Sequence, residues 1–211
     1  MFALPNALTV LRILLVPVFV VAYVMPGELA RLVAFAVFAL AGISDWLDGF
    51  AARKLKAGSD FGRMLDPIAD KVLVGVALMM LVAEGTFTQI KPNGMLSLLK
   101  LVPALIILAR EILVSGLREF LAGTRVSVPV TAVAKFKTAV QMIAIGAMIL
   151  APLADVLVPG IPSLTYTTIA YLLLWLAAAL TVYTGVAYFR NGMAHLRPGP
   201  SSEPGRMRET A

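Results

Sequence analysis

The sequence predicts an all-α membrane protein, folded as a bundle of six transmembrane helices with both termini in the cytoplasm. Three observations support this fold class. Hydrophobic residues make up 60% of the 211 residues and charged residues only 14%, whereas soluble domains are close to half apolar and about a quarter charged. Six apolar stretches each reach the roughly 20 residues that a helix needs to cross a hydrocarbon core of about 30 Å. Basic residues, finally, are concentrated on one side of the predicted membrane.

The first three helices are predicted at about residues 7–25, 30–53 and 64–84. The turn-forming pair Pro26-Gly27 follows the first of them. We expect this stretch to be a retained helix rather than a cleaved signal peptide, because Arg12 lies inside its apolar region and no basic run precedes it. The segment between the second and third helices is short and polar, so these two helices should be antiparallel neighbours.

The last three helices are predicted at about residues 98–122, 132–152 and 164–189. Segments rich in proline, glycine and asparagine separate them from one another and from the third helix, at residues 91–94, 123–129 and 159–162. We expect residues 1–190 to form one transmembrane domain. Residues 191–211 contain several proline, glycine and serine residues and are predicted to be a polar, disordered cytoplasmic tail.

The distribution of lysine and arginine predicts the orientation in the membrane. If the N-terminus is cytoplasmic, only Arg31, Lys91 and Lys100 lie on the outer side. Thirteen basic residues then lie in inner loops and at inner helix ends: Arg53, Lys54, Lys56, Arg63, Lys71, Arg118, Arg125, Lys135, Lys137, Arg190, Arg197, Arg206 and Arg208. Because cytoplasmic loops carry the excess of such residues, both termini should face the cytoplasm.

Composition also excludes several classes of function. The chain has no cysteine, so it has neither a disulfide framework nor a thiolate metal site. Its one histidine, His195, lies in the predicted tail, which argues against histidine chemistry. The net charge of +6 does not indicate nucleic-acid binding, because the basic residues are not clustered on a soluble module.

Four aspartates are the most informative residues in this oily chain. Asp45 and Asp48 are three residues apart near the end of the second helix, and Asp66 and Asp70 are four apart in the third. Each pair should therefore share one helix face. Ionised carboxylates near a bilayer are expensive and usually functional, and hard divalent cations prefer oxygen ligands. The pattern predicts a site for two metal ions suited to phosphoryl transfer.

Small residues and an arginine accompany the acids. Gly49, Ala52 and Gly62 would leave room for a bulky ligand, and Arg53 can bind phosphate oxygens through two parallel hydrogen bonds. The alternative is a set of helix-end acids that pair with neighbouring basic residues, namely Arg53, Lys54, Arg63 and Lys71.

The whole run, D-x2-D-G-x2-A-R-x8-G-x3-D-x3-D from Asp45 to Asp70, resembles the signature of the CDP-alcohol phosphatidyltransferase family. Members of that family join a CDP-linked lipid or alcohol to a hydroxyl acceptor and release CMP. The resemblance implies that Asp45, Asp48 and Asp66 ligate two Mg²⁺ or Mn²⁺ ions, and that Asp70 contacts the second ion and is the general base. It also implies a CDP-lipid site made by Gly49, Ala52, Arg53 and Gly62, and a homodimer.

Three further segments bear on the acceptor alcohol. The first contains Asn6, Thr9 and Arg12, which form a polar stripe at three-residue spacing near the membrane entrance. The alternative for this stripe is an ordinary helix start, with Asn6 as the cap and the Arg12 side chain extending to the interface.

The second and third segments contain Arg110, Arg118 and Lys135. These cations could converge beside the metal site and bind an anionic acceptor, because arginine is favoured for phosphate. A neutral alcohol would not need them. The alternatives are that Glu111 or Glu119 neutralises Arg110, and that Lys135 only reflects the cytoplasmic bias.

Together these segments resemble the bacterial branch of the family that uses CDP-diacylglycerol as donor and sn-glycerol 3-phosphate as acceptor. That branch implies phosphatidylglycerophosphate and CMP as products. The lack of a leader rich in serine and arginine favours a bacterial inner membrane over an organellar one, with the site at the cytoplasmic face. Branches that make cardiolipin, phosphatidylserine or phosphatidylinositol phosphate are the alternatives within the family. A small cation transporter is the alternative outside it, although the acids crowd at one end rather than along a path.

Overall fold

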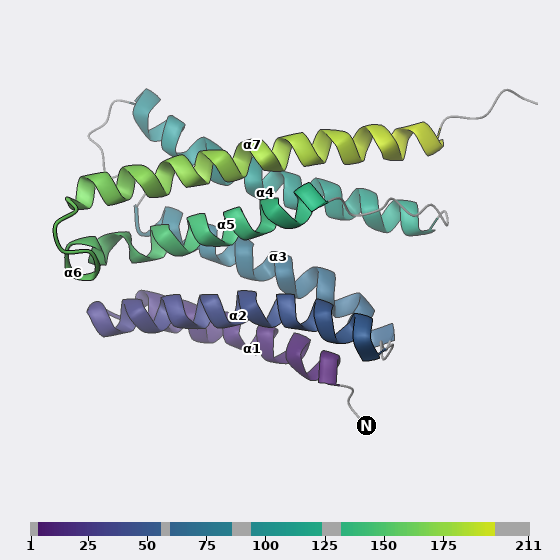
Figure 1. Ribbon diagram of the computed structural model, residues 1–211, viewed down its shortest axis with the longest axis horizontal. Coiled ribbons are helices and arrows are strands. Elements are labelled where there is room, and N and C mark those ends of the chain that lie inside the picture. Colours follow the sequence, from purple (N-terminus) through teal and green to yellow (C-terminus); the bar gives the residue numbers. More distant parts are fainter. Residues whose placement is uncertain (1–3, 56–59, 86–93, 124–131, 197–211) are drawn as a thin grey trace, which may run out of the picture.

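The computed structural model describes residues 4–55, 60–85, 94–123 and 132–196, and these ranges are helical apart from short turns (Figure 1). No strand occurs within them. The helices, in chain order, are α1 (Leu4–Val24), α2 (Glu28–Leu55), α3 (Asp60–Ala83), α4 (Gly94–Gly123), α5 (Ala132–Leu150), the short 3-10 helix η1 (Ala151–Leu153), α6 (Ala154–Leu157) and α7 (Ser163–Leu196).

The all-helical prediction is confirmed, and each predicted apolar stretch corresponds to one long helix. Within the described residues, two segments are long and apolar enough to span a membrane, judged by length and composition alone: Phe136–Leu157 and Ser163–Met193. The other long helices interrupt their apolar runs with charged residues or extend into residues whose side chains are not described. A count of six spans therefore stays a prediction.

The C-terminal helix is longer than expected. α7 continues to Leu196, past the predicted domain boundary at residue 190. Its last turns still pack on α4, because a Cβ added at Gly192 would lie 2.9 Å from Leu121 Cδ1 and 3.6 Å from Leu117 Cδ2. This packing explains why the helix does not end with its apolar run. The remainder of the predicted tail, from residue 197, lies outside the described residues.

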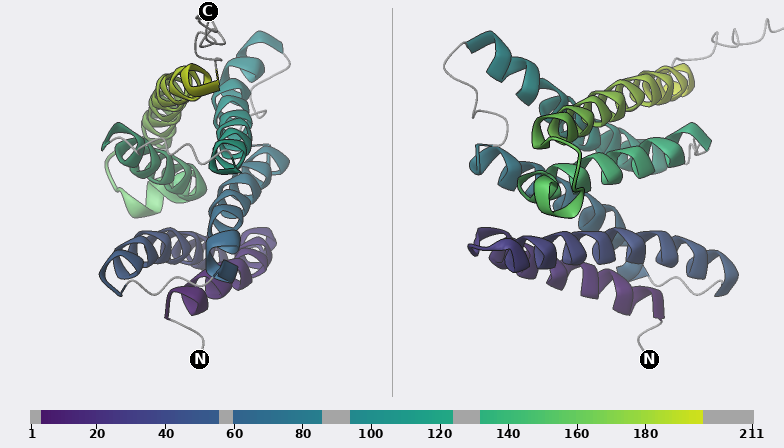
Figure 2. Two further views of the ribbon diagram at one scale, coloured as in Figure 1. Left: turned by 90° about the vertical axis from the view of Figure 1, so that its right-hand side faces the viewer. Right: turned by 60° about the vertical axis from the view of Figure 1, so that its left-hand side comes forward.

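The long helices form two groups with α3 between them. α1 packs most extensively on α2, while α7 packs on both α4 and α5. Figures 1 and 2 show the α1–α2 pair on one side and α4, α5 and α7 on the other, with α3 crossing obliquely from one group to the other. α3 contacts α1, α4 and α5 more than it contacts α2, although the two helices are sequential.

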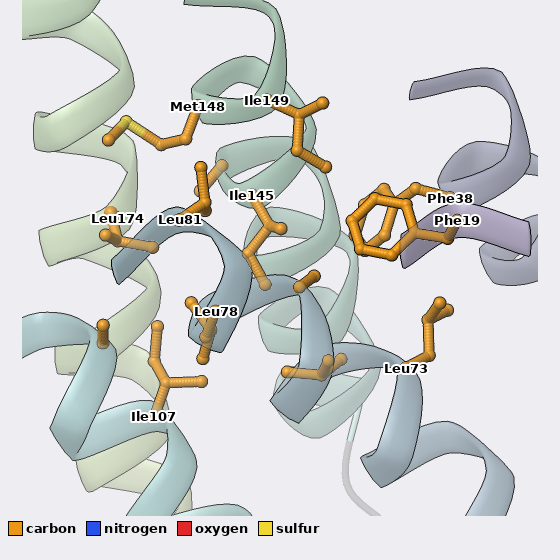
Figure 3. Packing of buried hydrophobic residues seen from close by; sticks show 14 of the residues in the cluster. Phe19, Phe38, Leu73, Leu78, Leu81, Ile107, Ile145, Met148, Ile149 and Leu174 are labelled. Carbon is orange, nitrogen blue, oxygen red and sulfur yellow. The ribbon is translucent and has the colours of Figure 1, made fainter. Parts of the chain in front are cut away.

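A continuous apolar core connects the two groups. Phe19 of α1 and Phe38 of α2 pack with their ring centroids 6.1 Å apart. Figure 3 shows Leu78 of α3 between Ile107 of α4 and Ile145 of α5. Within a bilayer, lipid is as apolar as these side chains, so close packing rather than water exclusion must hold the helices together. Many large apolar residues remain on the outer surface, as expected of a lipid-facing bundle.

A polar cluster fastens the end of the bundle opposite the aspartate motif. Arg31, at the start of α2, donates a hydrogen bond to Glu84, which directly follows α3, with Arg31 Nη1 3.2 Å from Glu84 Oε2. Tyr23 of α1 also donates to Glu84. The guanidinium carbon of Arg31 lies 4.3 Å from the centroid of the Tyr23 ring, within the range of a cation–π contact. One carboxylate thus ties three helices together.

Candidate functional site

The aspartate motif lies on two helices that are joined at the same end of the bundle. Asp45 and Asp48 belong to the C-terminal half of α2, and Asp66 and Asp70 to the N-terminal half of α3. Because both segments are helical, each pair has the spacing that puts its members on one face. Figure 1 shows the C-terminal end of α2 close to the N-terminal end of α3.

The side chains of the motif lie outside the described part of the structure. This holds for Asp45, Asp48, Asp66 and Asp70, and for Gly49, Ala52, Arg53 and Gly62, so the assigned roles stay predictions. Among the side chains that are described, no group of three or more histidine, cysteine, aspartate or glutamate residues could hold a metal ion. The aspartate motif therefore stays the candidate metal site.

Two residues of the predicted polar stripe on α1 point into the bundle. Thr9 is 1% exposed and Arg12 is 0% exposed. The interpretation in which the Arg12 side chain extends to the interface is therefore wrong. Asn6 lies within the first turns of α1, which begins at Leu4, and its side chain is not described. α1 packs against α2 and α3, the two helices that carry the motif, so a buried guanidinium lies among these three helices.

A second buried polar cluster joins α4, α5 and α7. Lys137 of α5 donates a hydrogen bond to Glu111 Oε1 of α4. Arg110 Nη1 donates to the same oxygen over 3.2 Å. Arg110 Nη2 donates to Thr184 Oγ1 of α7, also over 3.2 Å. Glu111 and Lys137 are both buried, at 8% and 4% exposure, and we call these four residues the Glu111 cluster.

The structure distinguishes among the three cations predicted to bind the acceptor. Arg110 has the counter-charge that one alternative required, because it pairs with Glu111. Arg118 is exposed, and its guanidinium carbon lies 6.0 Å from the centroid of the Tyr188 ring. The Arg118 side chain thus contacts a part of α7 that lies beyond Thr184. Lys135 lies on α5, but its side chain is not among those described.

Lys137 is the cation that sequence reasoning did not select. It lies in the same Lys-Phe-Lys-Thr run as Lys135, and it is the one that faces Glu111. A helical signal was available, because Gln141 is four residues further on and is 2% exposed. Residues four apart share a helix face, so a polar pair at this spacing in an apolar helix indicates a buried polar face.

The α7 side of the cluster was also missed. Thr181 and Thr184 are 0% and 7% exposed. Thr184 Oγ1 donates to the Leu180 carbonyl over 2.9 Å, so it can satisfy its hydrogen within its own helix while it accepts from Arg110. The next residue, Gly185, leaves room for Arg110, because a Cβ there would lie 3.2 Å from Arg110 Cγ. Threonine and glycine are common in membrane helices, which hides this signal.

Comparisons with known proteins agree with the motif. A family model described as CDP-alcohol phosphatidyltransferase matches residues 2–183. The chain is 42% identical to the CDP-diacylglycerol–glycerol-3-phosphate 3-phosphatidyltransferase of Rickettsia felis over 187 residues, which cover 89% of this chain and 93% of that protein. Proteins with the same name from Pseudomonas fluorescens and Haemophilus influenzae are 38% and 36% identical. The matched regions cover 92% and 90% of this chain, respectively, and 92% of each relative.

Proposed function

This chain belongs to the CDP-alcohol phosphatidyltransferase family, and we propose that it transfers the phosphatidyl group of CDP-diacylglycerol to sn-glycerol 3-phosphate. The products are phosphatidylglycerophosphate and CMP. The observation that carries this proposal is similarity over about nine-tenths of the chain to relatives named for that reaction. Family membership also argues against the cation transporter that the four aspartates alone would have allowed.

The donor set of the motif fits two divalent cations. Four carboxylates lie on neighbouring turns of two helices, and hard oxygen ligands of this kind suit Mg²⁺ or Mn²⁺. Asp45, Asp48, Asp66 and Asp70 would hold the ions. When bound, the ions would supply charge neutralisation at the diphosphate as CMP departs.

The protein's own residues then bind the substrates and move a proton. Asp70 accepts the proton of the C1 hydroxyl of glycerol 3-phosphate, as a general base must be ionised to do. The hydroxyl oxygen forms a bond to the phosphorus that carries diacylglycerol, and the bond from that phosphorus to the CMP oxygen breaks. Arg53 holds the diphosphate, while Gly49, Ala52 and Gly62 leave space for the nucleotide. Catalysis is then mostly positioning and electrostatic stabilisation.

An anionic acceptor suits the charge of the adjoining helices. Arg110, Arg118 and Lys135 remain the proposed phosphate-binding residues. The structure supports an anion here in one respect, since Arg110 and Lys137 share a single buried carboxylate. The Glu111 cluster thus keeps one positive charge in excess, and an acceptor phosphate would offset it.

The same proposal includes an arrangement of the protein in the membrane. All six long helices span a bacterial inner membrane, both termini and the motif face the cytoplasm, and the enzyme is a homodimer. CDP-diacylglycerol approaches from the inner leaflet with its acyl chains among the helices. The apolar outer surface of the bundle supports the membrane location. The catalytic domain extends to the end of α7 at Leu196, with a cytoplasmic tail after it.

A panel of acceptors tests the proposed function. Detergent-purified protein is mixed with CDP-diacylglycerol and Mg²⁺ or Mn²⁺, and then with glycerol 3-phosphate, phosphatidylglycerol, serine or inositol phosphate in turn. We expect CMP release and phosphatidylglycerophosphate formation with glycerol 3-phosphate, and little CMP release with the others. Faster turnover with another acceptor would assign the chain to a different branch of the family.

A further inference from the structure

Glu111 occupies an unusual electrostatic position. It is a buried carboxylate at the contact of three helices, and two cations donate to one of its oxygens. A third cation, Lys71 of α3, is close enough to interact with it electrostatically. Lys71 directly follows Asp70, the proposed general base. Lys71 thus brings the helix that carries the second half of the motif within electrostatic range of the Glu111 cluster.

The carboxylate holds the cations in place. Without it, Arg110 and Lys137 would be two like charges in a medium of low dielectric constant, where the repulsion between charges a few ångströms apart is large. Each long side chain would then turn away from the other. With it, the two cations converge on one carboxylate oxygen, and the second terminal nitrogen of Arg110, Nη2, donates to Thr184.

One nitrogen of Arg110 is left without a partner by this arrangement. Arg110 Nε is buried and has no hydrogen-bond partner in the described part of the chain. A buried N–H group without a partner is costly, so this donor is suited to an acceptor oxygen that arrives from outside the protein. Phosphate oxygens are such acceptors, and guanidinium groups bind them well.

We propose that Glu111 is a positioning residue, which orients Arg110 and Lys137 to bind the phosphate of the acceptor and so contributes to the choice of a phosphorylated alcohol. This inference rests on the proposed function. Glu111 itself does not touch the substrate; it acts through the two cations. The carboxylate itself repels an anion. The two cations that it holds in place attract the anion more strongly, because the cluster keeps one positive charge in excess.

The test is Glu111→Gln, which removes the charge and keeps the size of the side chain. We expect the KM for glycerol 3-phosphate to rise at least tenfold, while the KM for CDP-diacylglycerol changes less than twofold. The matched control is Glu84→Gln. Glu84 also receives hydrogen bonds from residues on two other helices, but at the opposite end of the bundle. We expect that variant to lose thermal stability and to keep both KM values.

Thermal unfolding gives a second measurement that does not depend on turnover. Glycerol 3-phosphate should raise the Tm of wild-type protein and of Glu84→Gln, but not that of Glu111→Gln. If Glu111→Gln does not fold, Thr184→Val can be tested instead, because it removes the hydrogen bond to Arg110 Nη2. We expect a two- to fivefold rise in the KM for glycerol 3-phosphate alone.

The outcomes separate this inference from the proposed function. If wild-type protein neither uses glycerol 3-phosphate nor is stabilised by it, the proposed function fails. If wild-type protein does both and Glu111→Gln behaves in the same way, or has a lower KM for the acceptor, the positioning role alone is wrong. A rise in both KM values to the same extent would also overturn it, since that result indicates a general loss of structure.

Discussion

Gly42 of α2 lies directly against Met142 of α5, so closely that a Cβ at position 42 would sit 2.4 Å from Met142 Cε. This contact is one turn before Asp45, the first residue of the aspartate motif. Because small residues let membrane helices approach each other, the glycine sets how near α2 comes to α5. The position of the motif relative to the Glu111 cluster depends on that approach.

The destabilisation caused by a substitution at Gly42 should therefore increase with the size of the new side chain. Met142 meets the new atom with the end of a flexible side chain, so Gly42→Ala should cost little stability. Gly42→Leu overfills the contact, and overpacking typically costs about 1–3 kcal/mol. We expect the leucine variant to lose Tm and most of its turnover, measured as CMP release in detergent. If Gly42→Leu is fully active, the close approach of α2 and α5 is not needed for catalysis.

Asp70→Asn should separate binding from chemistry. The amide cannot accept the proton of the attacking hydroxyl, and general base catalysis contributes about 10²–10⁴-fold to such steps. We expect turnover to fall by at least about 100-fold, with binding of CDP-diacylglycerol nearly unchanged in a direct binding assay. Normal turnover by this variant would show that another residue is the general base.

Arg118→Ala should weaken use of the acceptor more than use of the lipid. The exposed guanidinium is available to an approaching anion, and the Tyr188 ring holds it over α7. We expect the KM for glycerol 3-phosphate to rise several-fold more than that for CDP-diacylglycerol. Arg190, an exposed arginine on the same helix as Tyr188, provides the control. Arg190→Ala should change neither value, and equal effects of Arg118→Ala on both substrates would argue against an anion site.

Glu84→Ala should destabilise the protein without affecting the chemistry. It removes the acceptor shared by Arg31 and Tyr23, and hydrogen bonds to charged groups contribute about 1.5–3 kcal/mol each when partly buried. We expect a loss of at least about 2 kcal/mol in the free energy of unfolding, seen as a lower Tm, with kcat unchanged below the new Tm. A large loss of kcat at low temperature would show that this end of the bundle communicates with the motif.

Chelation should abolish activity reversibly. The four aspartates would lose the cations that offset their mutual repulsion, so CMP release should stop in EDTA and return when Mg²⁺ or Mn²⁺ is added in excess. The carboxylates should bind Mn²⁺ even in protein that carries Asp70→Asn, and titration of Mn²⁺ by its paramagnetic signal measures this. Full activity after exhaustive chelation would contradict a metal-dependent reaction.

The sequence predicted the helices well because a long apolar stretch marks each of them. The apolar stretches at 30–53 and 98–122, for example, correspond to α2 and α4, and both helices extend past the ends of these stretches. The short helices η1 and α6 were not predicted, because a few residues around Pro152 carry no periodic signal.

The candidate site was predicted only where charge and spacing coincide. The aspartates are conspicuous because each one is costly in an apolar chain. Lys137 was not distinguished from Lys135, since both agree with a cytoplasmic bias and only helix packing decides which one faces Glu111. Thr184 was missed for a different reason, namely that a hydroxyl bonded to its own helix is inconspicuous in any apolar run.

The packing of α1 affects the two helices that carry the aspartates. α1 packs on α2 and on α3, whereas α2 and α3 make little contact with each other. α1 therefore helps to set how α2 and α3 lie relative to each other. Bulkier or slimmer side chains on its inner face would shift these two helices, so changes far from any aspartate should also alter the proposed site for nucleotide and lipid.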